Sequence, residues 1–105
     1  MPTKFEAFAA LHVPGDPVVL YNIWDAGSAR AVAAAGAKAL ATGSHPVGDA
    51  SGFGDGQMVP LDFVFDNAKR IMDAVDLPLT VDFEGGYAVD PELTAANVSA
   101  LKATG

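Results

Sequence analysis

Apolar and polar residues alternate along the chain in blocks that predict strands separated by helices. Residues 17–24 (PVVLYNIW) form a nearly continuous apolar run, which is typical of a strand buried on both faces. Shorter apolar runs at residues 37–42 and 79–83 predict a second and a third strand. Because helical patterns follow each run, the sequence predicts an α/β fold with a parallel sheet covered by helices.

The first two helices are predicted from their start signals. Thr3 and Glu6 have the T-x-x-E spacing of a capping box, so a short helix is expected over residues 3–11. A second helix is expected over residues 29–35, with Asp25 or Ser28 as its N-terminal cap.

Two further helices are predicted later in the chain. The third begins at Pro60 and carries apolar residues at helical spacing on one face: Val64, Ala68, Ile71, Met72 and Val75. The last begins at Asp90-Pro91-Glu92, where a cap, a proline in the first turn and an acid all favour a helix start.

Residues 43–60 contain five glycines and show neither a helical nor a strand period. They predict a long loop after the second strand, at an edge where connections are normally short. Asp25, Asp82 and Glu84 each lie at the end of a predicted strand, at the same edge. Ligands bind at this carboxyl edge in parallel α/β folds, so the sequence predicts an acidic site there.

Asp82 and Glu84 are two residues apart in the third apolar run. Because side chains alternate across a strand, we expect both carboxylates on one side, where their repulsion needs compensation. A hard cation such as Mg²⁺ or Mn²⁺ would supply it, since these ions bind one or two carboxylates together with waters and substrate oxygens. The structural alternative is that the pair only marks the exit of the strand.

Composition narrows the range of partners. The 105 residues include 13 acidic and 6 basic side chains, a formal net charge of −7, which argues against nucleic acid or an anionic membrane as the main partner. The absence of cysteine excludes a disulfide scaffold and a thiolate metal site. No apolar run reaches membrane-spanning length, and we expect a cytoplasmic domain.

Four stretches in order resemble the isocitrate lyase/phosphoenolpyruvate mutase superfamily, in particular its small bacterial branch: YNIWDAGSARAVAAAG, ALATGSHPVGDASGFGDG, PLDFVFDNAKRIMDAVDLPLTVDFEGGY and DPE. The resemblance implies a parallel (β/α)₈ barrel of the TIM-barrel type. Residues 1–105 would form the N-terminal part of that single domain, with the short helix and the first three βα units. Since such a barrel needs about 250 residues, we expect the chain to be a piece of a longer protein.

The resemblance also implies roles for individual residues. Asp82 and Glu84 match the acidic pair that holds Mg²⁺, although many members have aspartate at the second position. Asp55 matches an aspartate near the reacting centre and is a catalytic candidate, as is Ser44. In this family pattern a further acidic ligand, a gating loop and a substrate-binding arginine follow residue 105.

Substrate-binding roles are implied for five positions. The stretch Gly43-Ser44-His45 matches the part of the family site that holds the substrate carboxylate with backbone N–H and hydroxyl groups, and such donors suit an anion. Tyr21 and Trp24, at the end of the first predicted strand, would line the pocket.

The implied function is a Mg²⁺-dependent lyase or mutase that acts on C–C or P–C bonds of small α-keto or α-hydroxy carboxylates through an enolate-like intermediate. We expect the protein to be a homo-oligomer like its relatives, and the 105 residues alone to be inactive. The alternative is a non-catalytic α/β module that self-associates and binds at most an anion or a metal. A nucleotide-binding fold is a weaker alternative, because no G-x-G-x-x-G motif follows the first strand.

Overall fold

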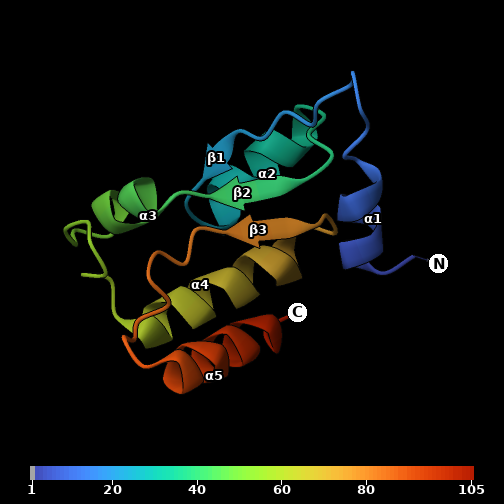
Figure 1. Cartoon of the computed structure of the whole chain (residues 1–105). Helices are drawn as coiled ribbons and strands as arrows, with labels where there is room; N and C mark the ends of the chain where they lie inside the picture. The colour runs from blue at the N-terminus through green and yellow to red at the C-terminus, as the bar shows by residue number, and fades with distance from the viewer. Residues whose placement is uncertain (1) are drawn as a thin grey trace.

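The computed structural model describes residues 2–105, which form a three-stranded parallel sheet and five helices. The strands β1 (Asn22–Ile23), β2 (Leu40–Thr42) and β3 (Leu79–Val81) lie side by side in chain order. Ile23 pairs with Thr42 and Thr42 pairs with Val81, so the three strands end at the same level (Figure 1). The predicted parallel α/β arrangement is confirmed.

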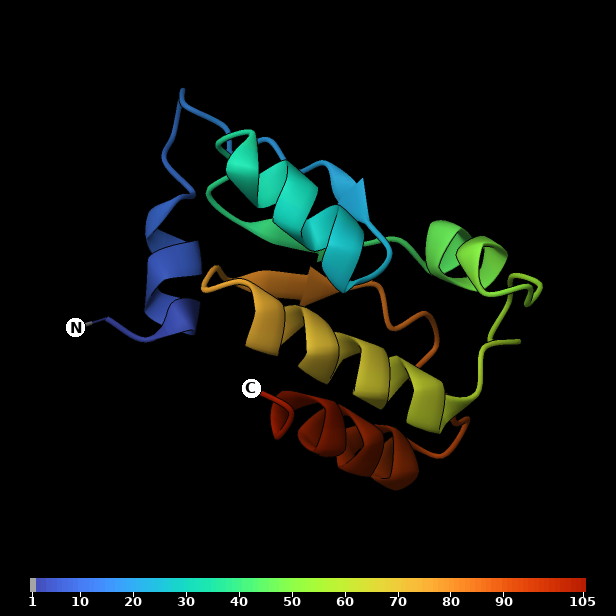
Figure 2. The ribbon, with the colours of Figure 1, turned by 180° about the vertical axis from the view of Figure 1, so that it is seen from behind.

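The helices are α1 (Lys4–Ala10), α2 (Ala26–Ala34), α3 (Ser44–Ala50), α4 (Leu61–Ala74) and α5 (Pro91–Lys102). Helices α2 and α4 pack against each other on one face of the sheet, and α5 packs on α4 (Figure 2). Helix α1 lies toward the amino ends of the strands, whereas α3 lies beyond their carboxyl ends (Figure 1). This arrangement leaves the carboxyl edge bordered by α3, the loop after it and the turn after β3.

The hydrophobic core joins the sheet to the two helices that cover it. Its fully buried members come from β1, α2, β2 and α4: Ile23, Ala29, Leu40 and Ile71. Full burial of an isoleucine or leucine side chain contributes about 1.5–3 kcal/mol. The core therefore fixes the strands against α2 and α4, and with them the edge where the strands end.

The predicted start signals are confirmed at three helices. Thr3 closes a capping box with Glu6 at the start of α1. Asp25 caps α2: its Oδ1 accepts a hydrogen bond from the backbone N–H of Ser28 at 2.8 Å, and the hydroxyl oxygen of Ser28 accepts the N–H of Asp25 at 3.1 Å. Asp90 caps α5 with a proline following it.

The predicted strand over residues 17–24 is wrong in length and in burial. Only Asn22 and Ile23 form β1, and residues Val19 and Tyr21 are 66% and 70% exposed. The physical reason is that β1 forms its ladder with β2 alone, so the residues before it have no hydrogen-bonded neighbour.

The second and third strands are also shorter than the predicted ranges 37–42 and 79–83. Their ladder runs from the Leu40–Leu79 pair to the Thr42–Val81 pair. It ends there because the backbone N–H of Asp82 donates to the hydroxyl oxygen of Thr42 at 3.2 Å.

The prediction that residues 43–60 form one continuous loop is wrong, because α3 occupies their first part. Gly43 is the residue before the helix, with extended backbone, and Pro46 lies in the first turn. The N–H groups of a first turn have no partner within the helix, so a proline costs little there. This helix of seven residues was not predicted, because the stretch is rich in glycine, which is typical of a loop.

Candidate active site at the carboxyl edge of the sheet

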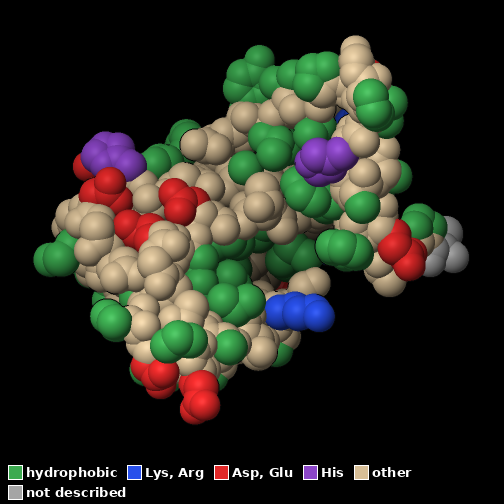
Figure 3. Space-filling view, viewed as in Figure 1, with side chains coloured by type: hydrophobic (Ala, Val, Ile, Leu, Met, Phe, Trp, Pro, Cys, Tyr) green, Lys and Arg blue, Asp and Glu red, His purple; other side chains and the backbone are tan. Residues whose placement is uncertain are grey.

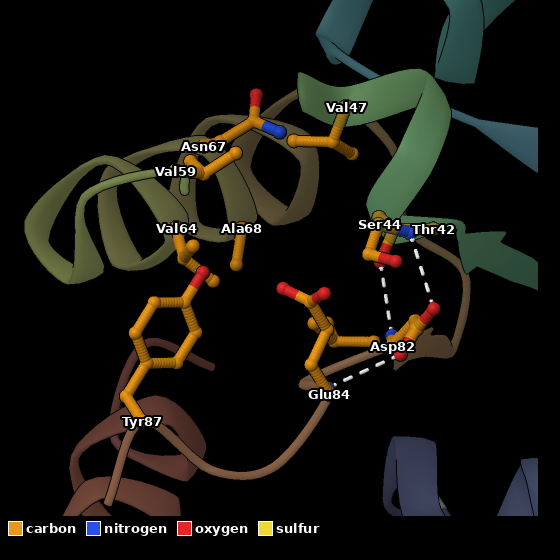
Figure 4. A pocket seen from close by; sticks show the side chains of 11 residues that line it. Thr42, Ser44, Val47, Val59, Val64, Asn67, Ala68, Asp82, Glu84 and Tyr87 are labelled. Atoms are coloured by element: carbon orange, nitrogen blue, oxygen red, sulfur yellow. Dashed lines mark hydrogen bonds between the residues drawn. The ribbon is translucent and has the colours of Figure 1, made fainter. Parts of the chain in front are cut away.

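A small cavity lies where β2 and β3 end, between α3, α4 and the turn after β3 (Figure 4). Its volume is about 20 Å³, enough for a single water molecule or metal ion. Valine and alanine side chains form part of its wall, and six polar residues face it: Thr42, Ser44, Asn67, Asp82, Glu84 and Tyr87.

Asp82 is held by two backbone donors. Its Oδ2 accepts a hydrogen bond from the N–H of Ser44 at 3.2 Å, and its Oδ1 accepts the N–H of Glu84 at 3.1 Å. The Ser44 N–H is the main cause that lowers the pKa of Asp82 below its ordinary value; partial burial opposes this, and the Glu84 N–H adds to it. Asp82 is therefore ionised at neutral pH.

Glu84 is held by a different segment. Both of its carboxylate oxygens accept the backbone N–H of Gln57, at 3.1 and 3.0 Å. Glu84 has a φ of 53°, in the left-handed region, and it lies beyond the end of β3. Strand alternation therefore does not orient Glu84, because β3 ends before it: the Asp82 carboxylate lies beside Ser44, whereas that of Glu84 turns toward α4 (Figure 4). Both still line one cavity, and backbone N–H groups compensate each carboxylate separately.

Tyr87 lies on the same cavity and was not predicted from the sequence. Partial burial raises its pKa above the ordinary value, and the negative charges of Glu84 and Asp82 raise it further. The phenol therefore keeps its proton at neutral pH and can donate it in a hydrogen bond to a ligand. The signal in the sequence was its place directly after the glycine pair that follows Glu84.

Asn67 is a second cavity residue that sequence reasoning missed. It lies on α4, and its side-chain amide donates to the backbone carbonyl oxygen of Trp24 at 3.0 Å. Only its place on the apolar face of α4, among residues such as Val64 and Ala68, indicated a special role.

Asp55 lies beside the start of α3. Its Oδ1 accepts a hydrogen bond from the hydroxyl of Ser44 at 3.3 Å, and its Oδ2 is 4.0 Å from Nδ1 of His45. The loop after α3 thus folds back on the first turn of that helix, and the structure brings Ser44, His45, Asp55 and Asp82 together. Acidic side chains gather beside a histidine at this end of the molecule (Figure 3).

The residue before α3, Gly43, lies close to the side chains of Asn22 and Pro46. A Cβ atom at this position would lie 2.8 Å from the side-chain nitrogen of Asn22 and 3.1 Å from the ring of Pro46. A side chain here would therefore displace the Asn22 side chain and press on the first turn of α3, which carries the donors of Ser44.

Tyr21 and Trp24 do not line this cavity. Tyr21 borders a separate, larger groove together with Val18, which precedes β1, and Lys38, which precedes β2. The backbone carbonyl of Trp24 accepts the hydrogen bond from Asn67, and the residue is 42% exposed. The substrate-lining role of both residues stays a prediction.

Among the described residues, the cavity offers two carboxylates, but no third acidic, histidine or cysteine side chain, to a hard divalent cation. Within residues 2–105, no group of three or more acidic, histidine or cysteine side chains is placed to hold a metal ion. Asp82 and Glu84 nevertheless present carboxylate oxygens to one cavity of ion size, and each accepts backbone hydrogen bonds that leave lone pairs free. Mg²⁺ commonly takes one or two carboxylates and completes its shell with waters and substrate oxygens, so these two residues suit it.

No helix of residues 2–105 has the length and apolar character needed to cross a membrane.

Residues 8–105 match the family model of phosphoenolpyruvate phosphomutase. The chain belongs to this family. An uncharacterised protein of Mycobacterium tuberculosis is 35% identical in an alignment of 103 positions that covers 94% of this chain and 38% of the relative. A provisionally assigned phosphonomutase of Burkholderia cenocepacia J2315 superimposes with a TM-score of 0.90 at 49% identity, over 93% of this chain and 40% of that one.

A more distant structure extends the likeness at the level of fold. 2,3-Dimethylmalate lyase, a member of the phosphoenolpyruvate mutase/isocitrate lyase superfamily, has a TM-score of 0.76 at 24% identity, over the whole of this chain and 38% of that one. The predicted superfamily is confirmed, and the fold matches the N-terminal part of its TIM-barrel members. The chain spans about two fifths of the length of these relatives.

Proposed function

We propose that the protein containing this chain is a Mg²⁺-dependent lyase or mutase, able to use Mn²⁺, that acts on C–C or P–C bonds of small α-keto or α-hydroxy carboxylates. The observation that carries the proposal lies at the carboxyl edge of the sheet. There the ionised Asp82 accepts a hydrogen bond from the N–H of Ser44 and lines the same cavity as Glu84. Membership of the phosphoenolpyruvate phosphomutase family supports an enolate-like intermediate.

Asp82 and Glu84 would hold the cation, with water and substrate oxygens as its other ligands. When bound, Mg²⁺ supplies positive charge that stabilises a developing enolate oxygen. The phenol of Tyr87, which keeps its proton at neutral pH, adds a neutral donor on the same cavity. These three residues would set the charge balance around the substrate.

The substrate carboxylate would bind at the entrance formed by Gly43, Ser44 and His45. The hydroxyl of Ser44 donates to Asp55 in the free protein, and a substrate oxygen would take over this donor. Asp55 would then lie beside the reacting atoms, as its catalytic role requires. Tyr21 and Trp24 remain candidates for an outer wall, because both are exposed at β1.

We also propose that the protein forms a homo-oligomer and works in the cytoplasm on a small anion rather than on nucleic acid or a membrane. The net charge of −7 supports the choice of partner. The 105-residue chain on its own should also self-associate, because Val19 and Tyr21 are exposed beside the open edge of β1 and unpaired apolar strand edges favour contacts with other chains.

The test is an assay of the intact protein that contains this chain, with Mg²⁺ and with EDTA, on three substrates: phosphoenolpyruvate, a 2-methylisocitrate and oxaloacetate. We expect Mg²⁺-dependent turnover of one of them. Asp82→Asn should lower the rate roughly 100-fold, because electrostatic stabilisation of the enolate is lost.

Asp66→Asn is the matched control, because Asp66 pairs with Arg70 on the exposed surface of α4 and should leave the rate unchanged. Turnover that survives EDTA, or an undiminished rate in Asp82→Asn, would refute the proposal. A folded protein that turns over none of the three substrates would favour the non-catalytic module.

A further inference from the structure

Three non-glycine residues among residues 2–105 have a positive φ: Gln57 at 60°, Glu84 at 53° and Tyr87 at 59°. A left-handed backbone costs a residue with a Cβ atom about 1–2 kcal/mol, so such positions persist only where contacts impose them. The three are separated by up to 30 residues in the chain, yet Gln57 forms hydrogen bonds with both Glu84 and Tyr87. Their grouping calls for a common cause.

Gln57 is the centre of this group. Its backbone N–H donates to both carboxylate oxygens of Glu84, at 3.1 and 3.0 Å. Its side-chain carbonyl oxygen accepts the backbone N–H of Tyr87 at 2.9 Å. One residue thus contacts both ends of the turn that follows β3, and those two ends carry two of the cavity residues.

The turn is shaped to admit the glutamine side chain. Gly85 lies between the two contacts, and a Cβ atom there would be 3.1 Å from Oε1 of Gln57, closer than ordinary packing allows. The absence of a side chain at Gly85 therefore lets the amide of Gln57 approach the backbone.

The segment around Gln57 also contacts the other half of the site. Asp55, two residues earlier, accepts the hydroxyl of Ser44. Gln57 itself does not line the cavity, so it acts only through the residues that do. A displacement of this segment would move the partners of Ser44 and of Glu84 together.

We propose that Gln57 is a positioning residue, which uses its backbone N–H and its side-chain carbonyl to hold the carboxylate of Glu84 and the backbone of Tyr87 in place for metal and substrate. The inference rests on the proposed function, because it assigns Glu84 and Tyr87 a purpose in that site. A misplacement of about 1 Å in such a site can lower the rate roughly 100-fold.

The test compares three substitutions of Gln57 in the intact protein. Gln57→Ala removes the carbonyl acceptor. Gln57→Asn keeps an amide and tolerates a left-handed backbone better, but it is one methylene too short to reach Tyr87. Gln57→Glu keeps an acceptor oxygen at the original reach and is the conservative rescue.

Three quantities are measured for each variant: hydrogen exchange at the amide of Tyr87, the Kd for Mn²⁺, and kcat and KM with the substrate that the wild type uses. In Gln57→Ala and Gln57→Asn we expect exchange to accelerate at least about tenfold, the Kd for Mn²⁺ to rise and kcat to fall by about tenfold, with KM changed less. Gln57→Glu should keep the amide protected and restore most of the Mn²⁺ affinity.

Unchanged exchange at Tyr87 in Gln57→Ala would overturn the inference. Faster exchange with unaltered Mn²⁺ affinity and kcat would overturn it as well, because the contact would then only shape the turn. If the wild type turns over no substrate, the proposed function fails separately, while faster exchange together with weaker Mn²⁺ binding in Gln57→Ala still supports the positioning role.

Discussion

Gly86 lies inside the turn that carries Glu84 and Tyr87, and replacing it by alanine perturbs that turn in two separable ways. Its φ is 76°, so Gly86→Ala forces a residue with a Cβ atom into the left-handed region, which costs about 1–2 kcal/mol. The new Cβ atom would also lie 2.6 Å from Cγ2 of Thr94 on α5. Overpacking of this kind costs about 1–3 kcal/mol.

The two effects together predict that Gly86→Ala lowers the free energy of unfolding by about 2–5 kcal/mol. Thr94→Ser separates them, because it removes the clashing methyl group but keeps the hydroxyl that donates to the carbonyl oxygens of Asp90 and Ala88. With the methyl group gone, the nearest atom would be Cβ of residue 94, at 3.7 Å. The double variant should therefore recover the steric part and retain only the backbone part.

Gly52→Ala is the matched control for the backbone part. Gly52 has a φ of 81°, and no atom lies within 4 Å of a Cβ placed there. Its substitution should cost about 1–2 kcal/mol and should not depend on Thr94. Urea denaturation of the intact protein gives the free energies of unfolding. The reasoning is refuted if Gly86→Ala costs no more than Gly52→Ala, or if Thr94→Ser gives no recovery in the double variant.

Two further predictions concern pH and association. Because the folded state holds the proton of Tyr87 to a higher pH than the unfolded state does, its contribution to stability is fully present below about pH 10 and is lost as the pH rises above that value. Denaturation at several alkaline pH values should show this loss in the wild type and a smaller one in Tyr87→Phe; parallel curves would contradict it. The 105-residue chain should elute as an oligomer in size exclusion with light scattering, and Val19→Lys should shift it toward the monomer by charging the residues beside the open edge of β1. A monodisperse wild-type monomer of 10.7 kDa would contradict the proposed association.

Four of the five helices in residues 2–105 were predictable because local chemistry decides them, whereas α3 was missed in a glycine-rich stretch. Asp90 and Pro91 supply a cap and a preset φ within two residues, and the apolar face of α4 repeats every turn. Strand lengths were less predictable, because they depend on pairing between distant segments. The apolar run before Ile23 looks like a buried strand, but only a partner strand on its second edge would make it one.

The sequence indicated some of the residues that line the cavity, but not the geometry of the cavity. Asp82 and Ser44 follow two strands, and parallel strands bring such positions to one edge. The orientation of Glu84 depends on its left-handed backbone and on a hydrogen bond from Gln57, 27 residues earlier. Neither the period of a strand nor a short motif encodes a contact of that kind, so strand alternation was the wrong reason for expecting both carboxylates at one cavity.

The charge balance of the site explains why backbone donors rather than cationic side chains hold its carboxylates. Within residues 2–105, neither the three ion pairs of lysine and arginine nor the His45–Asp55 contact includes Asp82 or Glu84. A lysine or arginine beside them would cancel a full negative charge and compete with a metal ion for the same oxygens. Backbone N–H groups carry only partial charges, so they fix the orientation of each carboxylate and leave most of its negative charge in place. A pair of carboxylates held in this way is oriented but not neutralised, and this is the condition under which a divalent cation gains most by binding to it.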